Sequence, residues 1–274
     1  MHDSPSNSGA TGSAVRRSIS QLPNYFASPE VAARYALVRP FFHREVMRQL
    51  CQLSGHTRFR HALDAGCGSG LSSLALAEIC EQVTAVDISE EMLAVAPQRA
   101  NIRYRIGRAE QLAEDEGPFD LITVGSALHW FEQVSFFAQC LQSLTEDGVL
   151  AVYNDHFTTH MRGNVECKRW MRTRFAREFP PPVRGMRDMD EALAQECGFR
   201  VAHRHAFEHL VPFGRKEMID YLMTRSNTLA VIHAGRHTEE SAAAWLNQGL
   251  APIVPDGVTG QFLFKCNLWL LRKK

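Results

Sequence analysis

Short apolar segments alternate with segments of helical periodicity along the first 155 residues of the chain. Five segments have the length of strands, at 61–66, 83–87, 102–106, 119–124 and 148–154, and three have helical spacing, at 71–80, 90–99 and 133–144. Strands that alternate with helices predict a parallel sheet whose strands are joined by crossover helices. The expected fold class is therefore α/β, of the doubly wound kind.

The flanking segments follow a less regular plan. Residues 29–50 show helical spacing around Pro40, which lacks an amide proton and clashes with the preceding turn, so a helix broken at this proline is expected. Residues 1–20 are rich in Ser, Gly and Asn and predict a disordered tail. After residue 155 the pattern predicts helices at 164–179, 189–197, 216–232 and 238–250, and strands at 199–213 and 259–272.

A glycine-rich turn follows the first predicted strand. Gly66, Gly68 and Gly70 separate this strand from a helix, so bare backbone and the positive end of a helix can approach a ligand. The second strand ends in Asp87, and a carboxylate at this position suits the two hydroxyls of a ribose. The two features predict a domain that binds a nucleoside cofactor.

The residues around the glycines indicate which nucleoside is bound. The dinucleotide fingerprint requires a third glycine where this chain has Leu71. Asp64 precedes the first glycine, where its carboxylate would repel a pyrophosphate and suit a cationic ligand, either directly or through water. S-adenosylmethionine meets these requirements, because it has no phosphate and carries a sulfonium charge and an amino-acid tail.

The motifs and their order resemble those of the class I S-adenosylmethionine-dependent methyltransferases. Residues 63–70 resemble the first motif, 86–89 the second, 107–112 the loop that meets the adenine, 119–131 the fourth strand with its loop, and 147–153 the fifth strand. The Ser-Ala-Leu-His-Trp-Phe loop is typical of a branch that resembles trans-aconitate methyltransferase and other small-molecule methyltransferases. The resemblance implies a mostly parallel, seven-stranded, Rossmann-like sheet that ends with one antiparallel strand, and a helical lid.

The resemblance also implies which side chains surround S-adenosylmethionine. Asp87 has the ribose position, and an acidic residue near Ala109 and Glu110 is expected at the adenine amino group. Tyr25 and Arg39 are expected to close the site, Arg39 toward the cofactor carboxylate, although aromatic packing and a solvated arginine explain them equally well. The expected cofactor contacts are Tyr25, Arg39, Asp64, Gly66, Cys67, Gly68, Gly70, Asp87, Ile88, Ala109, Glu110, Ser126, Ala127 and Trp130.

Three residues are candidates for contact with the methyl acceptor. His129 follows the fourth strand and is the candidate catalytic residue, either as a group that moves a proton or as a part of the cofactor pocket only. Arg225 and His233, in a presumed lid, could pair with an anionic acceptor or remain surface charges. Methyl transfer needs an aligned nucleophile and the exclusion of water, and an ionised carboxylate acceptor needs no base.

Three segments outside the predicted sheet are expected to form the lid. They lie at about 21–50, 155–187 and 214–257. Enzymes that resemble trans-aconitate methyltransferase have substrate-covering helices before the last strand. The segment at 214–257 has the same position in this chain. We therefore expect one methyltransferase domain over 21–274, with a lid rather than a second domain.

Composition restricts the remaining function classes. The chain has 30 Lys and Arg residues against 30 Asp and Glu residues, which argues against broad electrostatic capture of nucleic acid. No apolar run approaches the roughly 18 to 20 residues of a membrane span. The beginning of the chain lacks the hydrophobic core of a secretion signal. A cytoplasmic protein without a nucleic-acid or membrane partner is expected, and no motif indicates its oligomeric state.

The seven cysteines include no Cys-x-x-Cys pair, so neither structural zinc nor a disulfide framework is expected. Cys67 lies in the glycine-rich turn, where packing explains a small residue better than nucleophilic catalysis does. His203 and His205 would lie on one side of a strand, but no third ligand is indicated, and no metal is expected.

These observations predict an S-adenosylmethionine-dependent methyltransferase that acts on a small-molecule acceptor, such as a carboxylate or a secondary metabolite, with oxygen ahead of nitrogen. A nucleic-acid or protein methyltransferase is one alternative, which would require a basic rim or a target-base motif such as Asn-Pro-Pro-Tyr. A catalytically silent cofactor-binding module is the other, and the intact cofactor motifs argue against it.

Overall fold

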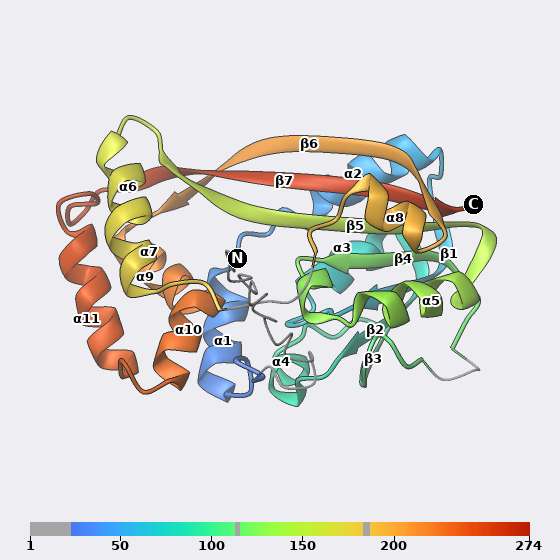
Figure 1. The fold of residues 1–274 in the computed structure, drawn as a ribbon, viewed down its shortest axis with the longest axis horizontal. Helices are drawn as coiled ribbons and strands as arrows, with labels where there is room; N and C mark the ends of the chain where they lie inside the picture. Colours follow the sequence, from blue (N-terminus) through green and yellow to red (C-terminus); the bar gives the residue numbers. More distant parts are fainter. Residues whose placement is uncertain (1–22, 113–115, 183–186) are drawn as a thin grey trace, which may run out of the picture.

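The computed structural model describes residues 23–112, 116–182 and 187–274, so the tail expected at 1–20 lies outside the described residues. Within these ranges seven strands form one sheet in the order β3-β2-β1-β4-β5-β7-β6 (Figure 1). β7 pairs antiparallel with β5 and β6, and the other pairs are parallel, which confirms the predicted sheet. The strands are β1 (Phe59–Ala65), β2 (Cys80–Asp87), β3 (Ile102–Ile106), β4 (Phe119–Gly125), β5 (Leu144–Met161), β6 (Phe199–Phe213) and β7 (Gly260–Lys273).

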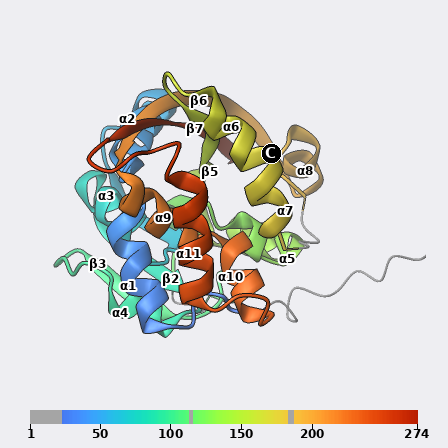
Figure 2. The same ribbon diagram turned by 90° about the vertical axis from the view of Figure 1, so that its left-hand side faces the viewer.

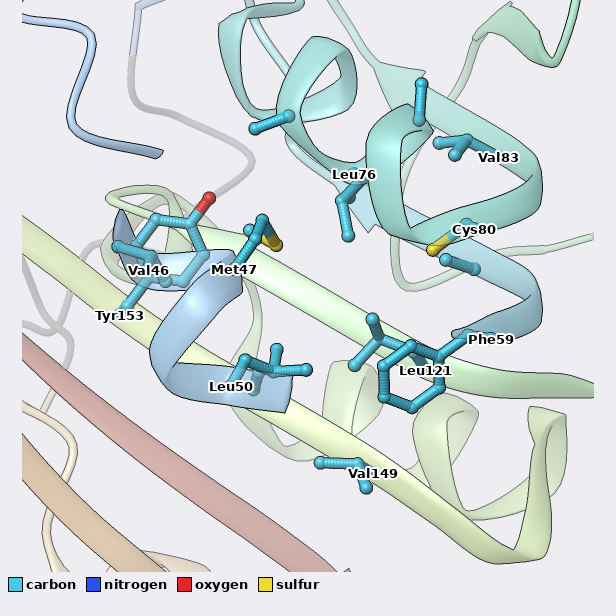
Figure 3. Packing of buried hydrophobic residues seen from close by; sticks show 14 of the residues in the cluster. Val46, Met47, Leu50, Phe59, Leu76, Cys80, Val83, Leu121, Val149 and Tyr153 are labelled. Atoms are coloured by element: carbon cyan, nitrogen blue, oxygen red, sulfur yellow. The ribbon is translucent and has the colours of Figure 1, made fainter. Parts of the chain in front are cut away.

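Helices cover both faces of the sheet, and successive strand residues pack on opposite faces. Leu121 of β4 packs with side chains of α2 and α3, whereas Ile122 packs with those of α5 and α8. Figure 3 shows Met47 and Leu50 of α2 and Leu76 of α3 against the strands. Strands buried on both faces explain the continuous apolar segments of the sequence. The helices of these layers are α2 (His43–Ser54), α3 (Leu71–Ile79), α5 (Gln133–Ser143) and α8 (Glu191–Glu196).

A group of helices lies beyond the carboxyl ends of the parallel strands. β5, β6 and β7 extend past the rest of the sheet toward these helices (Figure 1), and Figure 2, viewed from this end, shows α1, α9, α10 and α11 in front of the sheet. Phe157 of β5 and Phe262 of β7 share a buried cluster with Leu222 and Leu246 of these helices. The group comprises α6 (Val165–Trp170), the π-helical turn η3 (Met171–Phe175), α7 (Ala176–Glu178), α9 (Arg215–Met223), α10 (Ser226–His233) and α11 (Glu239–Leu250).

The boundaries of several elements differ from the predictions. β5 is longer than the predicted 148–154, because the residues that follow continue to pair with β7 as far as Met161. The helix predicted at 90–99 is the short α4 (Glu90–Ala94), since Pro97 disfavours helical geometry in the residue before it. The predicted break at Pro40 is confirmed, because α1 (Pro29–Val38) ends before this proline and α2 begins after it.

The helix predicted at 216–232 is interrupted between α9 and α10. Helix α9 ends at Met223, and Thr224 is its C-cap residue. The Thr224 hydroxyl donates a 2.8 Å hydrogen bond to the carbonyl oxygen of Tyr221, in the last turn of the helix. Arg225 then adopts an extended conformation, with ψ 139°, and precedes the first residue of α10. This break places Arg225 at a turn rather than within a helix.

Leu246→Ala should destabilise the protein by about 2–5 kcal/mol, because Leu246 is fully buried in the cluster between the helical group and the strand extensions. Urea denaturation followed by circular dichroism should show one transition, since β5 and β7 belong to the sheet and to this cluster. Gln248→Ala, on the exposed side of α11, should change the free energy of unfolding by less than about 0.5 kcal/mol. A separate early transition in the Leu246 variant would contradict a shared core.

Candidate functional site

A cavity of about 430 Å³ lies between the carboxyl edge of the sheet and helices α1, α9 and α10. Its lining includes the glycine-rich turn after β1, the ends of β2 and β4, the loop after β3, and residues of β5 and β7. This volume is within the range of small-molecule sites. The cavity therefore brings together the segments that the sequence motifs predict at one edge of the sheet.

The glycine-rich turn has a conformation that only glycine adopts readily. Gly66 and Gly70 have φ values of 68° and 75°. A Cβ atom on Gly66 would lie 2.7 Å from Cβ of Ala127, and one on Gly70 would lie 2.5 Å from the hydroxyl oxygen of Tyr104. Gly66 lines the cavity, whereas Gly70 does not. Gly70 is the N-cap residue that precedes α3, so the structure gives it a role in the turn, and its expected cofactor contact stays a prediction.

Asp64 is buried beneath this turn. The hydroxyls of Ser72, Ser73 and Thr123 donate hydrogen bonds of 2.6, 2.6 and 3.0 Å to its carboxylate. The residue has an exposed fraction of 0%, and burial raises its pKa while the three hydroxyls favour the charged form. Asp64 is absent from the cavity lining. Asp64 therefore lies behind the lining, where it joins the turn to α3 and β4, and its expected role toward a cationic ligand, direct or through water, stays a prediction.

Asp87 ends β2 at the cavity. The amides of Gly68 and Ser89 donate hydrogen bonds of 2.8 and 2.9 Å to its two carboxylate oxygens, one to each. Each oxygen retains capacity for a second donor, so the carboxylate can accept two further hydroxyls. Burial raises the pKa of Asp87. The neighbouring Ile88 also lines the cavity and is 56% exposed, which provides an apolar surface beside this polar group.

The loop after β3 contributes Ala109 and Glu110 to the lining. Oε1 of Glu110 accepts a 2.9 Å hydrogen bond from the Glu132 amide and a 3.3 Å bond from Arg108. These contacts fix the carboxylate next to the cavity, at the position expected for the adenine amino group. Ala109 is nearly fully buried and packs beneath it.

The loop after β4 begins with a strained residue. Ser126 has φ 55°, a region that residues other than glycine rarely occupy and that occurs often at functional sites. Its Oγ accepts a 3.3 Å hydrogen bond from the Asp155 amide. Ser126, Ala127, His129 and Trp130 all line the cavity, the last two from a 3-10 turn, η2 (Leu128–Trp130). The structure thus brings all four predicted residues of this loop to one site.

Arg39 lies between α1 and α9. Its guanidinium stacks over the Tyr35 ring, 4.3 Å from the ring centroid, and Nη2 donates a 2.8 Å hydrogen bond to the carbonyl oxygen of Thr224. Nε is buried and has no hydrogen-bond partner among the described residues. Since Arg39 lines the cavity, this unpaired donor fits an anionic group of a ligand.

Tyr25 connects three parts of the cavity wall. Its ring centroid lies 6.1 Å from that of Trp130 and 5.7 Å from that of His233. Tyr25 and Arg225 line the cavity, whereas His233 does not. His233 packs against Tyr25 outside the lining, and its pairing with an anionic acceptor stays a prediction, whereas Arg225 lies at the cavity because the break between α9 and α10 places it there.

Several lining residues were missed from the sequence. Asp155 follows the predicted strand 148–154 directly, so the rule that singled out Asp87 could have found it. The others lie on elements without a recognisable motif, and only the tertiary fold brings them to the site. The missed residues that figure below are Phe42, His43, Asp155, His156, Tyr221 and Phe264.

Cys67 lines the cavity, but burial raises the pKa of its thiol well above the ordinary value, which fits packing rather than nucleophilic catalysis. In the part of the chain that the structure describes, no three His, Cys, Asp or Glu side chains are grouped so that they could hold a metal ion. Of the described helices, none combines the length and apolar character of a membrane span.

Comparisons with known proteins agree with this geometry. Residues 63–152 match the family model of a methyltransferase domain. A Dictyostelium discoideum protein provisionally named as a methyltransferase is 28% identical over 178 residues, which cover 64% of this chain and 67% of that protein. A ubiquinone biosynthesis O-methyltransferase from Caulobacter sp. (strain K31) is 38% identical over 108 residues. These cover 36% of this chain and 43% of the relative, so the match spans less than half of that protein.

A solved structure shares the fold over most of both chains. It is a provisionally named type II methyltransferase from Anaeromyxobacter dehalogenans, with a TM-score of 0.63 and 22% sequence identity. The alignment covers 84% of this chain and 95% of that chain. At this identity the likeness establishes the fold, including the elements that follow the matched family domain.

His43→Gln should reduce the pH dependence of stability. Burial lowers the pKa of His43 to about 3, and its Nδ1 lies 3.1 Å from the Tyr153 hydroxyl. An unfolded histidine titrates near 6.5, so the unfolded state binds more protons as the pH falls from 6.5 toward 3, and stability decreases by up to about 1.4 kcal/mol per pH unit. Urea unfolding between pH 7 and 5 should show a steeper loss in the wild type than in the variant.

His160→Gln is the control for this measurement, because His160 is exposed and should leave the slope unchanged. Parallel curves for the wild type and the His43 variant would contradict a neutral, buried His43.

Proposed function

We propose that the chain is a class I S-adenosylmethionine-dependent methyltransferase that methylates an oxygen of a small-molecule acceptor inside this cavity, and the match of residues 63–152 to a methyltransferase domain supports the proposal. The observation that carries the proposal is the composition of the lining. One group of lining residues, called the cofactor side below, comprises the glycine-rich turn and the Asp87 carboxylate. A second group, called the acceptor side, comprises aromatic and polar side chains from α2, β5, β7, α9 and α10. The first group suits the cofactor and the second an acceptor.

Residues on the cofactor side have the chemistry that S-adenosylmethionine requires. The free acceptor capacity of Asp87 suits the ribose hydroxyls, and the fixed Glu110 carboxylate suits the adenine amino group. The unpaired Nε of Arg39 suits the carboxylate of the amino-acid tail. Ile88 and Trp130 provide apolar surface at the cavity. The cofactor supplies the electrophilic methyl group, so the protein needs to orient the acceptor and exclude water.

The acceptor side favours a small molecule over a macromolecule. A cavity of about 430 Å³ beneath helices α9 and α10 encloses a ligand of limited size. His129 lies at the carboxyl edge of β4 and remains the candidate for a polar contact with the acceptor there, and Arg225, directly before α10, also lines the cavity. The Caulobacter relative named as an O-methyltransferase supports oxygen as the methylated atom.

Incubation of the purified protein with methyl-labelled S-adenosylmethionine and a metabolite extract tests the proposal. Labelled small molecules that carry the methyl group on oxygen are the expected result. Label on RNA, DNA or protein alone would overturn the proposal in favour of a macromolecular methyltransferase. Binding of S-adenosylhomocysteine without any transfer would indicate a silent cofactor-binding module.

Asp87→Ala should weaken the binding of S-adenosylhomocysteine by about 1–3 kcal/mol, through the loss of charge-assisted hydrogen bonds to the ribose. Isothermal titration calorimetry measures this change, and circular dichroism verifies the fold. Asp147→Ala, at an exposed site near the other end of β5, is the matched control and should bind as the wild type does. Unchanged affinity in a folded Asp87 variant would remove this residue from the ribose site.

A further inference from the structure

Asp155 of β5 and His209 of β6 form a hydrogen-bonded pair beside the cavity. Nε2 of His209 lies 2.9 Å from Oδ1 of Asp155, and the two strands are separated by β7. The Asp155 side chain is 4% exposed and lines the cavity, whereas the His209 side chain is 23% exposed. The pair, called the dyad below, thus connects a nearly buried carboxylate with an imidazole that reaches solvent.

The carboxylate lies where methyl transfer is expected. The Asp155 amide donates to Oγ of Ser126, the strained residue at the carboxyl end of β4. Among the described residues the hydrogen bonds of the Asp155 carboxylate involve Oδ1 only, so Oδ2 retains its full capacity as an acceptor. A base must lie within hydrogen-bond reach of the proton that it removes, and an acceptor in the cavity can come this close to Asp155, which lines it.

Aromatic side chains pack against the His209 ring of the dyad. Phe42 stacks on His209 with ring centroids 5.9 Å apart and an interplanar angle of 23°, and Phe264 lies 5.6 Å from the same ring. Phe42, Phe264 and Tyr221 also line the cavity. Aromatic walls of this kind favour a planar, apolar ring as the ligand.

On the basis of the proposed function, we propose that Asp155 is the base that removes the proton from a hydroxyl group on an aromatic acceptor, and that His209 positions it. The acceptor oxygen forms a bond with the methyl carbon while the bond between that carbon and the cofactor sulfur breaks, and the electron pair stays on sulfur. The hydroxyl proton moves to the Asp155 carboxylate. The dyad then holds one additional proton, which the partly exposed His209 releases to water.

Other acceptor classes fit the dyad less well. An ionised carboxylate has no proton to lose and would be repelled by Asp155. An amine would be held in its protonated form by the same carboxylate, and a protonated amine has no lone pair for the methyl group. A hydroxyl on an aromatic ring is neutral when it binds and becomes nucleophilic as its proton leaves.

The charged and titratable groups around the dyad come from β5 itself and from three further elements. His43 of α2 remains neutral, since burial lowers its pKa to about 3. His156 of β5 has a lowered pKa, through burial first and the charges of Lys265 and Arg225 as well. Cys266 of β7 stays a thiol, because burial and the Asp155 carboxylate raise its pKa. The Arg225 guanidinium, before α10, is the fixed positive charge that would stabilise a developing oxyanion.

The test compares Asp155→Asn with the wild type on phenol, catechol, benzoic acid and aniline, with methyl-labelled donor, and on a metabolite extract. Alkali releases label from methyl esters but not from phenyl ethers or N-methyl amines, and mass spectrometry of the stable products separates the last two classes. The variant should lose about 100-fold or more in kcat at pH 7. The deficit should shrink near pH 10, where a phenol ionises without a base. Asp147→Asn is the matched control and should keep the wild-type rate.

His209→Gln should lower kcat with little change in KM and shift the pH profile in the same direction as Asp155→Asn, whereas the exposed His160→Gln should do neither. Affinity for S-adenosylhomocysteine, measured by calorimetry without any acceptor, should stay within about twofold of the wild type in every variant. This measurement separates a base from a cofactor ligand.

Each other outcome overturns the proposal. Ethers formed equally well by Asp155→Asn would remove its role as base, and a loss of cofactor affinity with an unchanged pH profile would assign Asp155 to the cofactor. Label only in alkali-labile esters or in N-methyl products would refute the acceptor class while a small-molecule methyltransferase still stands. Label only on RNA, DNA or protein, or the absence of any transfer despite cofactor binding, would refute the dyad's role together with the proposed function.

Discussion

The buried Asp64 carboxylate is the interaction on which the geometry of the site depends. Burial of a carboxylate is costly unless hydrogen bonds compensate it, and three hydroxyls offset part of that cost here. They come from the first turn of α3 and from β4, so the same carboxylate holds strand, glycine-rich turn and helix together. The position of the glycine-rich turn then determines where the Gly68 amide contacts Asp87 and where Ala127 packs against Gly66.

The extensions of β5, β6 and β7 provide the second half of the site. Their side chains share one buried cluster with the helices beyond the sheet. The helices that cover the cavity are therefore packed on strands of the same sheet whose carboxyl edge forms the other part of the cavity wall. Arg39 and Tyr25 link this cover to the segment before β1 by cation–π and ring contacts. The acceptor side is therefore built on extended strands rather than on loops alone, which favours fixed positions for groups such as Asp155.

The sequence predicted the features that local patterns determine. The strand segments, the glycine-rich turn, Asp87 and the break at Pro40 each depend on residues a few positions apart, and all of these appear where expected. The hydrogen bonds of Asp64 could not be predicted in full, because one of its three partners, Thr123, lies 59 residues away. The dyad was missed because its members are 54 residues apart and meet only across β7. The contact between His233 and Tyr25 could not be predicted either, because it depends on how α10 packs, which helical periodicity does not specify.

A crystal structure of the protein with S-adenosylhomocysteine would test the central claim most directly. We expect the ribose hydroxyls to contact Asp87 and the adenine to lie beside Ile88. The sulfur should face the part of the cavity between Ser126 and Asp155. A nucleoside bound elsewhere, or one whose sulfur faces away from this part of the cavity, would contradict it.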